Sequence, residues 1–334
     1  MKINLLSITS IFLITLIGCK NQTAETESAS TSAVAYSLMQ DWPDLPDSIQ
    51  LGNATGLDID KHGHLFVFHR AGRQWTDPFP EDPITRPTIF MLDAESGNLI
   101  NSWGEDLFIM PHGLTADKEN NVWMTDVARH QVFKFSHEGE LLLTLGEEGI
   151  YGTDSSHFYL PTDIAIASNG NIYVSDGYGN SRVIVFDPSG KYLFDWGIFG
   201  DLPGQFNTPH GIDIDEEGNV YVADRENNRI QKFSAEGEFI KLWQNEEGEQ
   251  LYSVVTGKNG DVFGIDYHVV AESIVKGSDI IHLDALESVL NRYGRNGNYN
   301  GEVVRYHDIA IDEKGNLYTA DILENTIQKF NSTK

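Results

Sequence analysis

The feature that most constrains this chain is a repeated unit of short strands. Its clearest copy, residues 208–233, reads TPHGIDIDEEGNVYVADRENNRIQKF. An apolar segment with a His is followed by a turn at EEGN, the strand VYVAD and, after DRENN, the strand RIQKF; SAEGEFIKLW then supplies a turn and a fourth strand. Short segments of alternating apolar residues, separated by Gly and Asn, are typical of half-buried antiparallel strands. The unit therefore predicts a small antiparallel sheet.

Further copies of this unit occur along the sequence, and their starting points are 43 to 56 residues apart. A four-stranded repeat of that length indicates a β-propeller, in which each blade is one sheet and neighbouring blades supply the core. The prediction is an all-β fold, a six-bladed β-propeller. The other copies span 110–135, 160–186 and 305–330, with weaker ones at 54–70 and 251–268.

The last unit ends at IQKF, one strand short of a complete blade. The segment Tyr36–Trp42 resembles the fourth strands at 191–197 and 238–244. We infer that this N-terminal strand completes the sixth blade, which closes the ring and removes open sheet edges. Residues 36–334 are then one propeller domain, since no second shift of composition suggests a boundary.

The first residues indicate export. Lys2 precedes the apolar run Ile3–Ile17, and a small residue precedes Cys19, which is the pattern of a lipoprotein signal whose Cys becomes the lipidated first residue. Residues 1–19 are then the signal peptide and residues 20–35 a flexible polar tether. The expected location is the bacterial cell envelope, lipid-anchored to a membrane and facing the periplasm or the cell surface; the alternative is an ordinary signal peptide. Cys19 is the only Cys, so the folded domain has no internal disulfide.

The formal net charge of −27 argues against nucleic acid as a partner, because phosphate binding needs clustered Lys and Arg. We interpret the charge as a solvated acidic surface. A monomer is expected.

One position of the first strand carries His in every second blade. Aligning the first strands places His112, His210 and His307 together, 98 and 97 residues apart. The first strands line the channel of a propeller, so the three imidazoles should converge there. Three neutral His around an open fourth position are a catalytic zinc arrangement; alone, each would be a structural side chain. The same position holds Thr55, Thr162 and Tyr252 in the other blades. Other His fall in turns or loops and have no predicted role, among them His62, His64, His137 and His157.

A second position lies just after the Asp that ends the second strand, at the mouth of the channel. It holds Arg70 and Arg225 in two blades, and Tyr178 follows it in a third. Two Arg and a Tyr above three His predict a site for a small anion, a carboxylate above all. The alternative is that Arg225 pairs with Glu226 and that Tyr178 packs between blades. The insertion at 71–87 is predicted to be a loop beside these residues.

The residues around these positions form a set of motifs: FHR (68–70), LFIMPHGL (107–114), NVWMTDVARHQVFKF (121–135), HFYLPTDIAI (157–166), VSDGYGNSR (174–182), PGQFNTPHGI (203–212), VADRENNRIQKF (222–233) and HDIA (307–310). Together they resemble the peptidyl-α-hydroxyglycine α-amidating lyases (peptidylamidoglycolate lyases), the lyase half of the peptide-amidating enzymes, which are built on a six-bladed propeller of NHL repeats. The resemblance covers about residues 50–332. Generic NHL repeats share the glycines and RIQKF, but not the three His together with DGYGNSR and FHR.

The resemblance implies a role for each of these residues. The family's zinc ligands match His112, His210 and His307. Its catalytic tyrosine matches Tyr178, whose phenolate would be the base, with a pKa depressed by the metal and by Arg70. The arginines around the substrate carboxylate and hydroxyl match Arg70 and Arg225.

A structural calcium site is also implied by the resemblance. It matches Asp308 together with the backbone carbonyls of Leu57 and Leu114, and such oxygen ligands suit a hard cation. The implied activity is that of a zinc-dependent carbon–nitrogen lyase. It cleaves a small carbinolamide or peptide substrate, R–CO–NH–CH(OH)–COO⁻, to an amide and glyoxylate. The natural substrate, and whether iron replaces zinc, stay open.

Some positions depart from the family. The four positions that match its two disulfides hold Tyr159, Gly179, Tyr221 and Lys232. The two residues before the third His are Arg305 and Tyr306, where the family has Met-Pro. The fifth blade barely matches.

Two other functions remain as alternatives. One is a non-catalytic NHL propeller that binds a protein or ligand at the cell envelope, which would not need three His in alternate blades. The other is a calcium-dependent lactonase or esterase propeller, which needs channel-facing acidic residues. Asp163 and Asp308 are the only first-strand acids adjacent to the His position, too few for that hypothesis.

Overall fold

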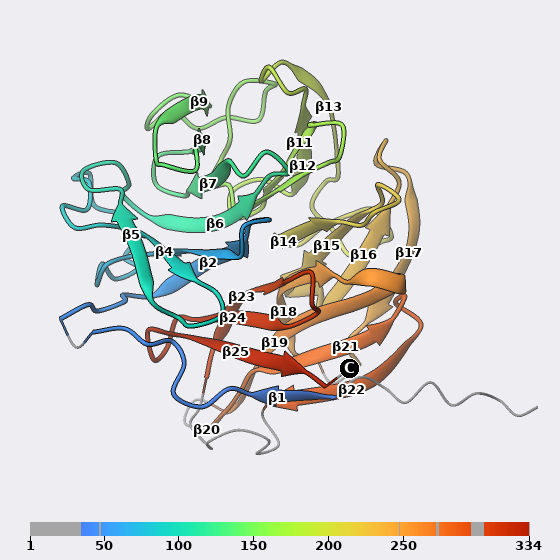
Figure 1. Cartoon of the computed structure of the whole chain (residues 1–334). Helices are drawn as coiled ribbons and strands as arrows, with labels where there is room; N and C mark the ends of the chain where they lie inside the picture. The colour runs from blue at the N-terminus through green and yellow to red at the C-terminus, as the bar shows by residue number, and fades with distance from the viewer. Residues whose placement is uncertain (1–34, 47, 247, 272–273, 295–303, 334) are drawn as a thin grey trace, which may run out of the picture. The chain divides into compact units, whose positions relative to one another are not determined.

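The computed structural model describes residues 35–46, 48–246, 248–271, 274–294 and 304–333. These residues form antiparallel sheets of strands that mostly follow one another in sequence (Figure 1). The first strands of the sheets contact one another in a closed ring, from β2 through β6, β10, β14, β18 and β23 back to β2. This is a six-blade β-propeller, and the predicted fold class is confirmed.

The blades share one order of strands from the channel outward. Blade one has β2 (Ala54–Ile59), β3 (His64–His69), β4 (Ile89–Asp93) and β5 (Leu99–Trp103); blade two has β6 (Pro111–Ala116), β7 (Val122–Asp126), β8 (Gln131–Phe135) and β9 (Leu141–Leu145). Blade three has β10 (Asp163–Ile166), β11 (Ile172–Asp176), β12 (Arg182–Phe186) and β13 (Tyr192–Trp196); blade four has β14 (Pro209–Ile214), β15 (Val220–Asp224), β16 (Arg229–Phe233) and β17 (Phe239–Gln244). Blade five has β18 (Gln250–Thr256), β19 (Asp261–Ala271), β21 (Asp279–Asp284) and β22 (Ser288–Gly294), with β20 (Ile274–Gly277) paired to β19. Blade six has β23 (Tyr306–Ile311), β24 (Leu317–Asp321), β25 (Thr326–Ser332) and β1 (Tyr36–Leu38). Two 3-10 turns are η1 (Arg225–Asn227) and η2 (Lys258–Gly260).

The outer strand of blade six comes from the N-terminal side of the chain. β1 pairs antiparallel with β25, with Tyr36 opposite Ser332. The Tyr36 ring also meets the rings of Phe263 and Tyr293 of blade five edge-on, with centroids 5.5 and 5.1 Å apart. The strand is shorter than the matching sequence segment, because the backbone turns through Asp41, which has a φ of 58°.

Apolar clusters lie between neighbouring blades. One cluster joins Phe66 and Phe68 of β3 to Val122 and Met124 of β7, around the fully buried Phe108. Removing such a ring typically costs about 3 to 5 kcal/mol. The sheets therefore share their cores, as expected for a unit too small to bury its own faces.

The inner strands are irregular at the aligned position of the sequence. The register of β14 with β15 passes from Pro209 directly to Gly211, and that of β23 with β24 from Tyr306 to Asp308. Similar shifts occur in β2, β6 and β18. Such bulges leave one residue unpaired and re-aim its side chain. In this propeller, the unpaired residues include His210 and His307, which turn toward the channel.

The positions that match the family's disulfides form two adjacent pairs. Tyr221 lies opposite Lys232 in the β15–β16 pair, and Lys232 Nζ is 4.8 Å from the centre of the Tyr221 ring. A Cβ added to Gly179 would lie 2.2 Å from Tyr159 Cγ, so the glycine packs directly on that ring. Non-covalent contacts therefore occupy both places.

The predicted signal peptide with Cys19, and most of the predicted tether, lie outside the described residues. Within the part of the chain that the structure describes, we find no helix of the length and apolarity needed to cross a membrane.

Candidate active site

Three histidines from alternate blades meet in the channel. His112 on β6, His210 on β14 and His307 on β23 have ring centroids 4.6 to 4.9 Å apart. One nitrogen of each ring lies within 4.8 Å of the other two. Each residue is at most 4% exposed. The structure thus brings together the three residues predicted to bind zinc, which we call the channel histidines.

Each channel histidine is oriented by the next blade. The three Nδ1 atoms lie 2.6 to 2.7 Å from backbone carbonyl oxygens of Thr162, Tyr252 and Thr55, the residues at the equivalent position of the adjacent blades. A carbonyl only accepts, so Nδ1 carries the proton and Nε2 presents its lone pair to the channel. Burial, aided by neighbouring positive charges, lowers the pKa of all three imidazoles well below the ordinary value. Three neutral, pre-oriented Nε2 donors fit a transition metal such as zinc.

Tyr178 lies against two of these histidines. Its hydroxyl oxygen is 3.0 Å from the Nε2 atoms of both His112 and His210, and Arg225 Nη1 donates to it at 3.3 Å. Burial raises the pKa of Tyr178, and the charges of Arg225 and Arg70 oppose that rise. Burial outweighs the arginine charges here, because a buried phenolate loses its hydration. The depressed pKa expected for this tyrosine depends on the metal as well as on Arg70.

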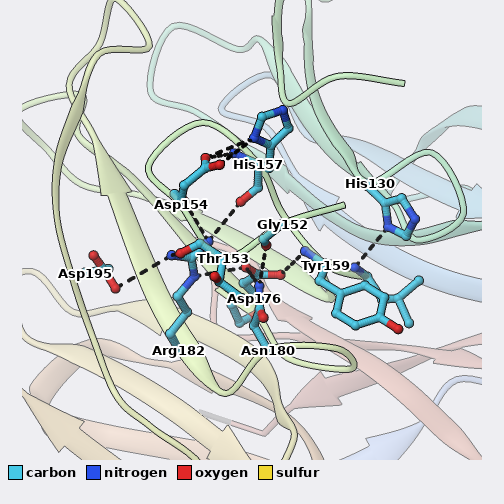
Figure 2. A network of polar contacts seen from close by, with 12 residues as sticks. His130, Gly152, Thr153, Asp154, His157, Tyr159, Asp176, Asn180, Arg182 and Asp195 are labelled. Atoms are coloured by element: carbon cyan, nitrogen blue, oxygen red, sulfur yellow. Dashed lines mark hydrogen bonds and ion pairs between the residues drawn. The ribbon is translucent and has the colours of Figure 1, made fainter. Parts of the chain in front are cut away.

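A buried carboxylate holds the loop that carries Tyr178. Asp176, at the end of β11, accepts hydrogen bonds from Asn180 Nδ2 at 2.7 Å and from Arg182 Nε at 3.0 Å (Figure 2). Arg182 also donates to three backbone carbonyls within 153–157. Tyr178 lies between Asp176 and Asn180 in sequence, so this network fixes the short loop on both sides of the tyrosine.

An equivalent hydrogen-bond network occurs in blade four, around an arginine. Asp224, at the end of β15, accepts from Asn227 Nδ2 at 2.8 Å and from Arg229 Nε at 2.7 Å. Arg225 lies between them. The repeat therefore presents a tyrosine in one blade and an arginine in the next on equally supported loops.

A cavity of about 310 Å³ adjoins the channel histidines. Its lining brings Arg70, Arg225 and Arg305 to one space with Tyr178 and His307. Three guanidinium groups around one cavity suit an anionic ligand, and their planar forks match a carboxylate.

The two predicted arginines are held differently. Arg70 is buried, and its Nε donates to the carbonyl of Pro111 at 3.2 Å; burial lowers the pKa of Arg70 to about 10, so it stays charged near neutral pH. Arg225 pairs with Glu226 at 2.8 Å, which was the structural alternative. The same guanidinium also reaches Tyr178, so the ion pair and the contact to the candidate site coexist.

Four further residues line the cavity and had no role assigned from sequence: Trp75, Tyr252, Arg305 and Ile322. Trp75, from the insertion, has its ring 5.3 Å from that of Tyr178 and 5.0 Å from Arg70 Cζ. Arg305 lies over the ring of Tyr252, at 5.3 Å. The available signals were the insertion beside Arg70 and the departure from the family at position 305.

The residues predicted to hold calcium also share a cavity. Asp308, Leu57 and Leu114 border a space of about 40 Å³ between the inner strands. The carboxylate of Asp308 accepts a hydrogen bond from the Leu57 N–H at 2.9 Å and one from the Ser253 hydroxyl at 2.8 Å.

The same cavity is more acidic than the sequence indicated. Asp58, Asp163 and Asp213 border it together with Asp308, whereas only Asp163 and Asp308 had been recognised beside the His position. Burial raises the pKa of all four carboxyls, that of Asp308 to about 7 and that of Asp213 to about 6. Buried carboxylates that repel one another are costly without a cation, so this donor set fits calcium.

Comparison with known proteins places these residues in context. Residues 108–135, 158–186 and 206–233 match the NHL repeat. The chain is 35% identical over 317 residues to the peptidyl-glycine alpha-amidating monooxygenase B of Xenopus laevis, covering 88% of this chain and 35% of that protein. It is 32% identical over 329 residues to the peptidyl-alpha-hydroxyglycine alpha-amidating lyase 1 of Drosophila melanogaster, covering 88% of this chain and 59% of that protein.

Among solved structures, a streptogramin B lyase has a TM-score of 0.55 at 14% identity and covers 90% of this chain and 97% of that chain. At that identity the likeness concerns the fold alone. The chain spans 35% and 59% of the two curated relatives. The resemblance drawn from the motifs is confirmed at the level of NHL repeats and of homologues with amidating-lyase names.

Proposed function

Since this chain carries NHL repeats on a six-blade propeller and is homologous to proteins named peptidyl-alpha-hydroxyglycine alpha-amidating lyase, we propose that it is a zinc-dependent carbon–nitrogen lyase. It cleaves a carbinolamide, R–CO–NH–CH(OH)–COO⁻, to an amide and glyoxylate. The main support for the proposal is the position of the Tyr178 hydroxyl. It contacts two channel histidines and Arg225, beside the arginine-lined cavity.

The arginines orient the substrate. Its carboxylate lies between Arg70, Arg225 and Arg305, which share the cavity of about 310 Å³. Charge-assisted hydrogen bonds from planar guanidinium groups fix the direction of the adjacent carbon. The hydroxyl on that carbon then faces Tyr178 and the channel histidines. Holding the reacting groups in this geometry lowers the entropic part of the barrier.

Tyr178 moves the proton. The reaction transfers one proton from the substrate hydroxyl to the departing amide nitrogen, while the C–N bond breaks and the carbonyl of glyoxylate forms. Tyr178 accepts the hydroxyl proton as phenolate. The charges of Arg225 and Arg70 favour that form without outweighing burial, and a metal on the channel histidines would favour it further. A zinc ion on the three Nε2 atoms would lower the pKa of the substrate hydroxyl. Calcium at Asp308 would neutralise the acidic cavity between the inner strands.

The direct test uses α-hydroxyhippurate, a minimal carbinolamide with a free carboxylate. The zinc-replete chain should convert it to benzamide and glyoxylate, and the methyl ester should be a poor substrate. Release of no glyoxylate above background would overturn the proposal in favour of a non-catalytic propeller that binds a ligand.

A further inference from the structure

A second group of metal-ligating side chains lies at the opposite end of blade one. Among the described residues, Asp60, His62, His64 and His137 each offer one ligand atom, and these atoms all lie within 4.8 Å of one another. Asp60 and His62 lie in the turn between β2 and β3, and His64 begins β3. His137 lies in the turn that follows β8 in blade two. We call these four residues the turn cluster.

The turn cluster is separate from the channel histidines. Thr55, near the start of β2, contacts His307, whereas Asp60 follows the end of the same strand. Five residues of strand place the two groups on the order of 15 Å apart. The turn cluster therefore cannot share an ion with the candidate active site.

The spacing of the ligand atoms suits a tetrahedral ion. Asp60 Oδ2 is 3.1 Å from His137 Nε2 and 3.5 Å from the Nδ1 atoms of His62 and His64. His64 Nδ1 and His137 Nε2 are 2.9 Å apart. Tetrahedral zinc with bonds of about 2.0 to 2.2 Å separates its ligand atoms by about 3.3 to 3.6 Å. The two distances of 3.5 Å fall in that range. Those of 3.1 and 2.9 Å are shorter than its lower end by about 0.2 and 0.4 Å.

Hydrogen bonds to one oxygen of the Asp60 carboxylate leave its other oxygen facing the histidines. Its Oδ1 accepts the backbone N–H groups of His62 and His64 at 2.9 and 2.8 Å, which fixes the carboxylate. Its Oδ2 is buried and receives no hydrogen bond from any residue that the structure describes. A buried carboxylate oxygen left without a hydrogen bond is costly unless a cation meets it.

We propose that Asp60, His62, His64 and His137 form a second metal site, which binds zinc or a similar divalent transition metal. Three imidazole nitrogens and one carboxylate oxygen complete a tetrahedral shell, the closed type that stabilises structure and leaves no position for substrate. Because His137 belongs to blade two and the other ligands to blade one, the ion joins adjacent blades.

The alternative explanation for the turn cluster is a protonated histidine paired with Asp60. Measuring how many Zn²⁺ ions each chain binds distinguishes a metal site from such an ion pair. The full chain is stripped with a chelator and dialysed against Zn²⁺. We expect two equivalents of Zn²⁺ per wild-type chain and one in Asp60→Asn and in His137→Ala. The Asn keeps an oxygen for the two backbone N–H groups, so the turn can form. The matched control is His157→Ala, since His157 also pairs with a carboxylate, Asp154, at 2.9 Å, and it should keep two equivalents.

Thermal unfolding isolates the second site. In the His210→Ala background, Zn²⁺ should still raise Tm, and adding Asp60→Asn should abolish that rise. Glyoxylate release should be the same in Asp60→Asn and wild type, so this proposal and the proposed lyase activity can fail independently. The proposal is overturned if His137→Ala and Asp60→Asn bind as much Zn²⁺ as wild type, or if His210→Ala removes all of it.

Discussion

The channel histidines come from blades that alternate around the ring, whereas the turn cluster comes from two neighbouring blades. In the channel, His112, His210 and His307 are at most 4% exposed, and a backbone carbonyl of the next blade fixes each ring. In the turn cluster, the side chains of His62, His64 and His137 are 57%, 25% and 19% exposed. The carboxylate of Asp60 supplies the fourth ligand atom there.

The number of protein ligands distinguishes a candidate catalytic site from a candidate structural site in this fold. Three protein ligands leave one position for a reactant, and four fill the shell. Only the channel histidines adjoin a cavity with Tyr178 and three arginines. Four experiments test this contrast, in decreasing order of the change that we expect.

The sharpest contrast is between His307→Ala and His137→Ala. The Tyr178 hydroxyl contacts His112 and His210. Loss of His307 therefore removes one imidazole donor and leaves both of these tyrosine contacts in place. Glyoxylate release should fall by more than the roughly 10–100-fold that loss of an outer-shell partner costs. His137→Ala should release glyoxylate at the wild-type rate. Equal losses in both variants would contradict the separation of the two sites.

Tyr178→Phe tests the base without touching a ligand. It should lower kcat by about 10²–10⁴-fold, the range for a positioned base, while zinc content stays at the wild-type value. Tyr159→Phe is the control, because Tyr159 packs on the neighbouring Gly179 and on His130, which is not a channel histidine. If Tyr178→Phe turns over as fast as wild type, another group accepts the proton.

Stability against pH should test the acidic cavity. The folded pKa of Asp308 is about 7, above the unfolded value of about 3.9. The folded state therefore binds more protons between these values, and the free energy of unfolding of chelator-treated protein should fall as pH rises through that window. Melting curves at about pH 5 and about pH 8 should show the fall, and Ca²⁺ should reverse it at the higher pH. In Asp308→Asn the pH dependence should be smaller; an unchanged profile would reject this origin.

The smallest effect is expected for Arg305→Met. Arg70 and Arg225 remain in the cavity, so KM should rise by about tenfold, about 1.4 kcal/mol, with little change in kcat. Arg129→Met is the control, since Arg129 pairs with Glu148 in blade two and does not line the cavity. A large fall in kcat would instead assign Arg305 to the reacting atoms.

Much of the fold and part of the candidate site could be predicted because both are periodic. The alternating strands and their turns repeat at a nearly constant interval, which determined the number of blades and put His112, His210 and His307 at one height. The same register brought Arg70, Arg225 and Tyr178 to the mouth of the channel. Residues at equivalent places of a repeat must be equivalent in space, so their convergence follows without a tertiary model.

Contacts between residues that are not at equivalent positions of the repeat became visible in the tertiary structure alone. Trp75 lies in an insertion, and its contact with Tyr178 depends on the path of that loop. His137 meets His64 across two blades from positions that do not correspond in the repeat, so neither residue predicts the other. The pKa of Tyr178 depends on two opposing effects of its surroundings: burial raises it, and the charges of Arg225 and Arg70 lower it. The repeat in the sequence specifies which residues are equivalent around the ring. Packing between blades specifies which inequivalent residues touch, because such contacts depend on the packing distance and not on the repeat.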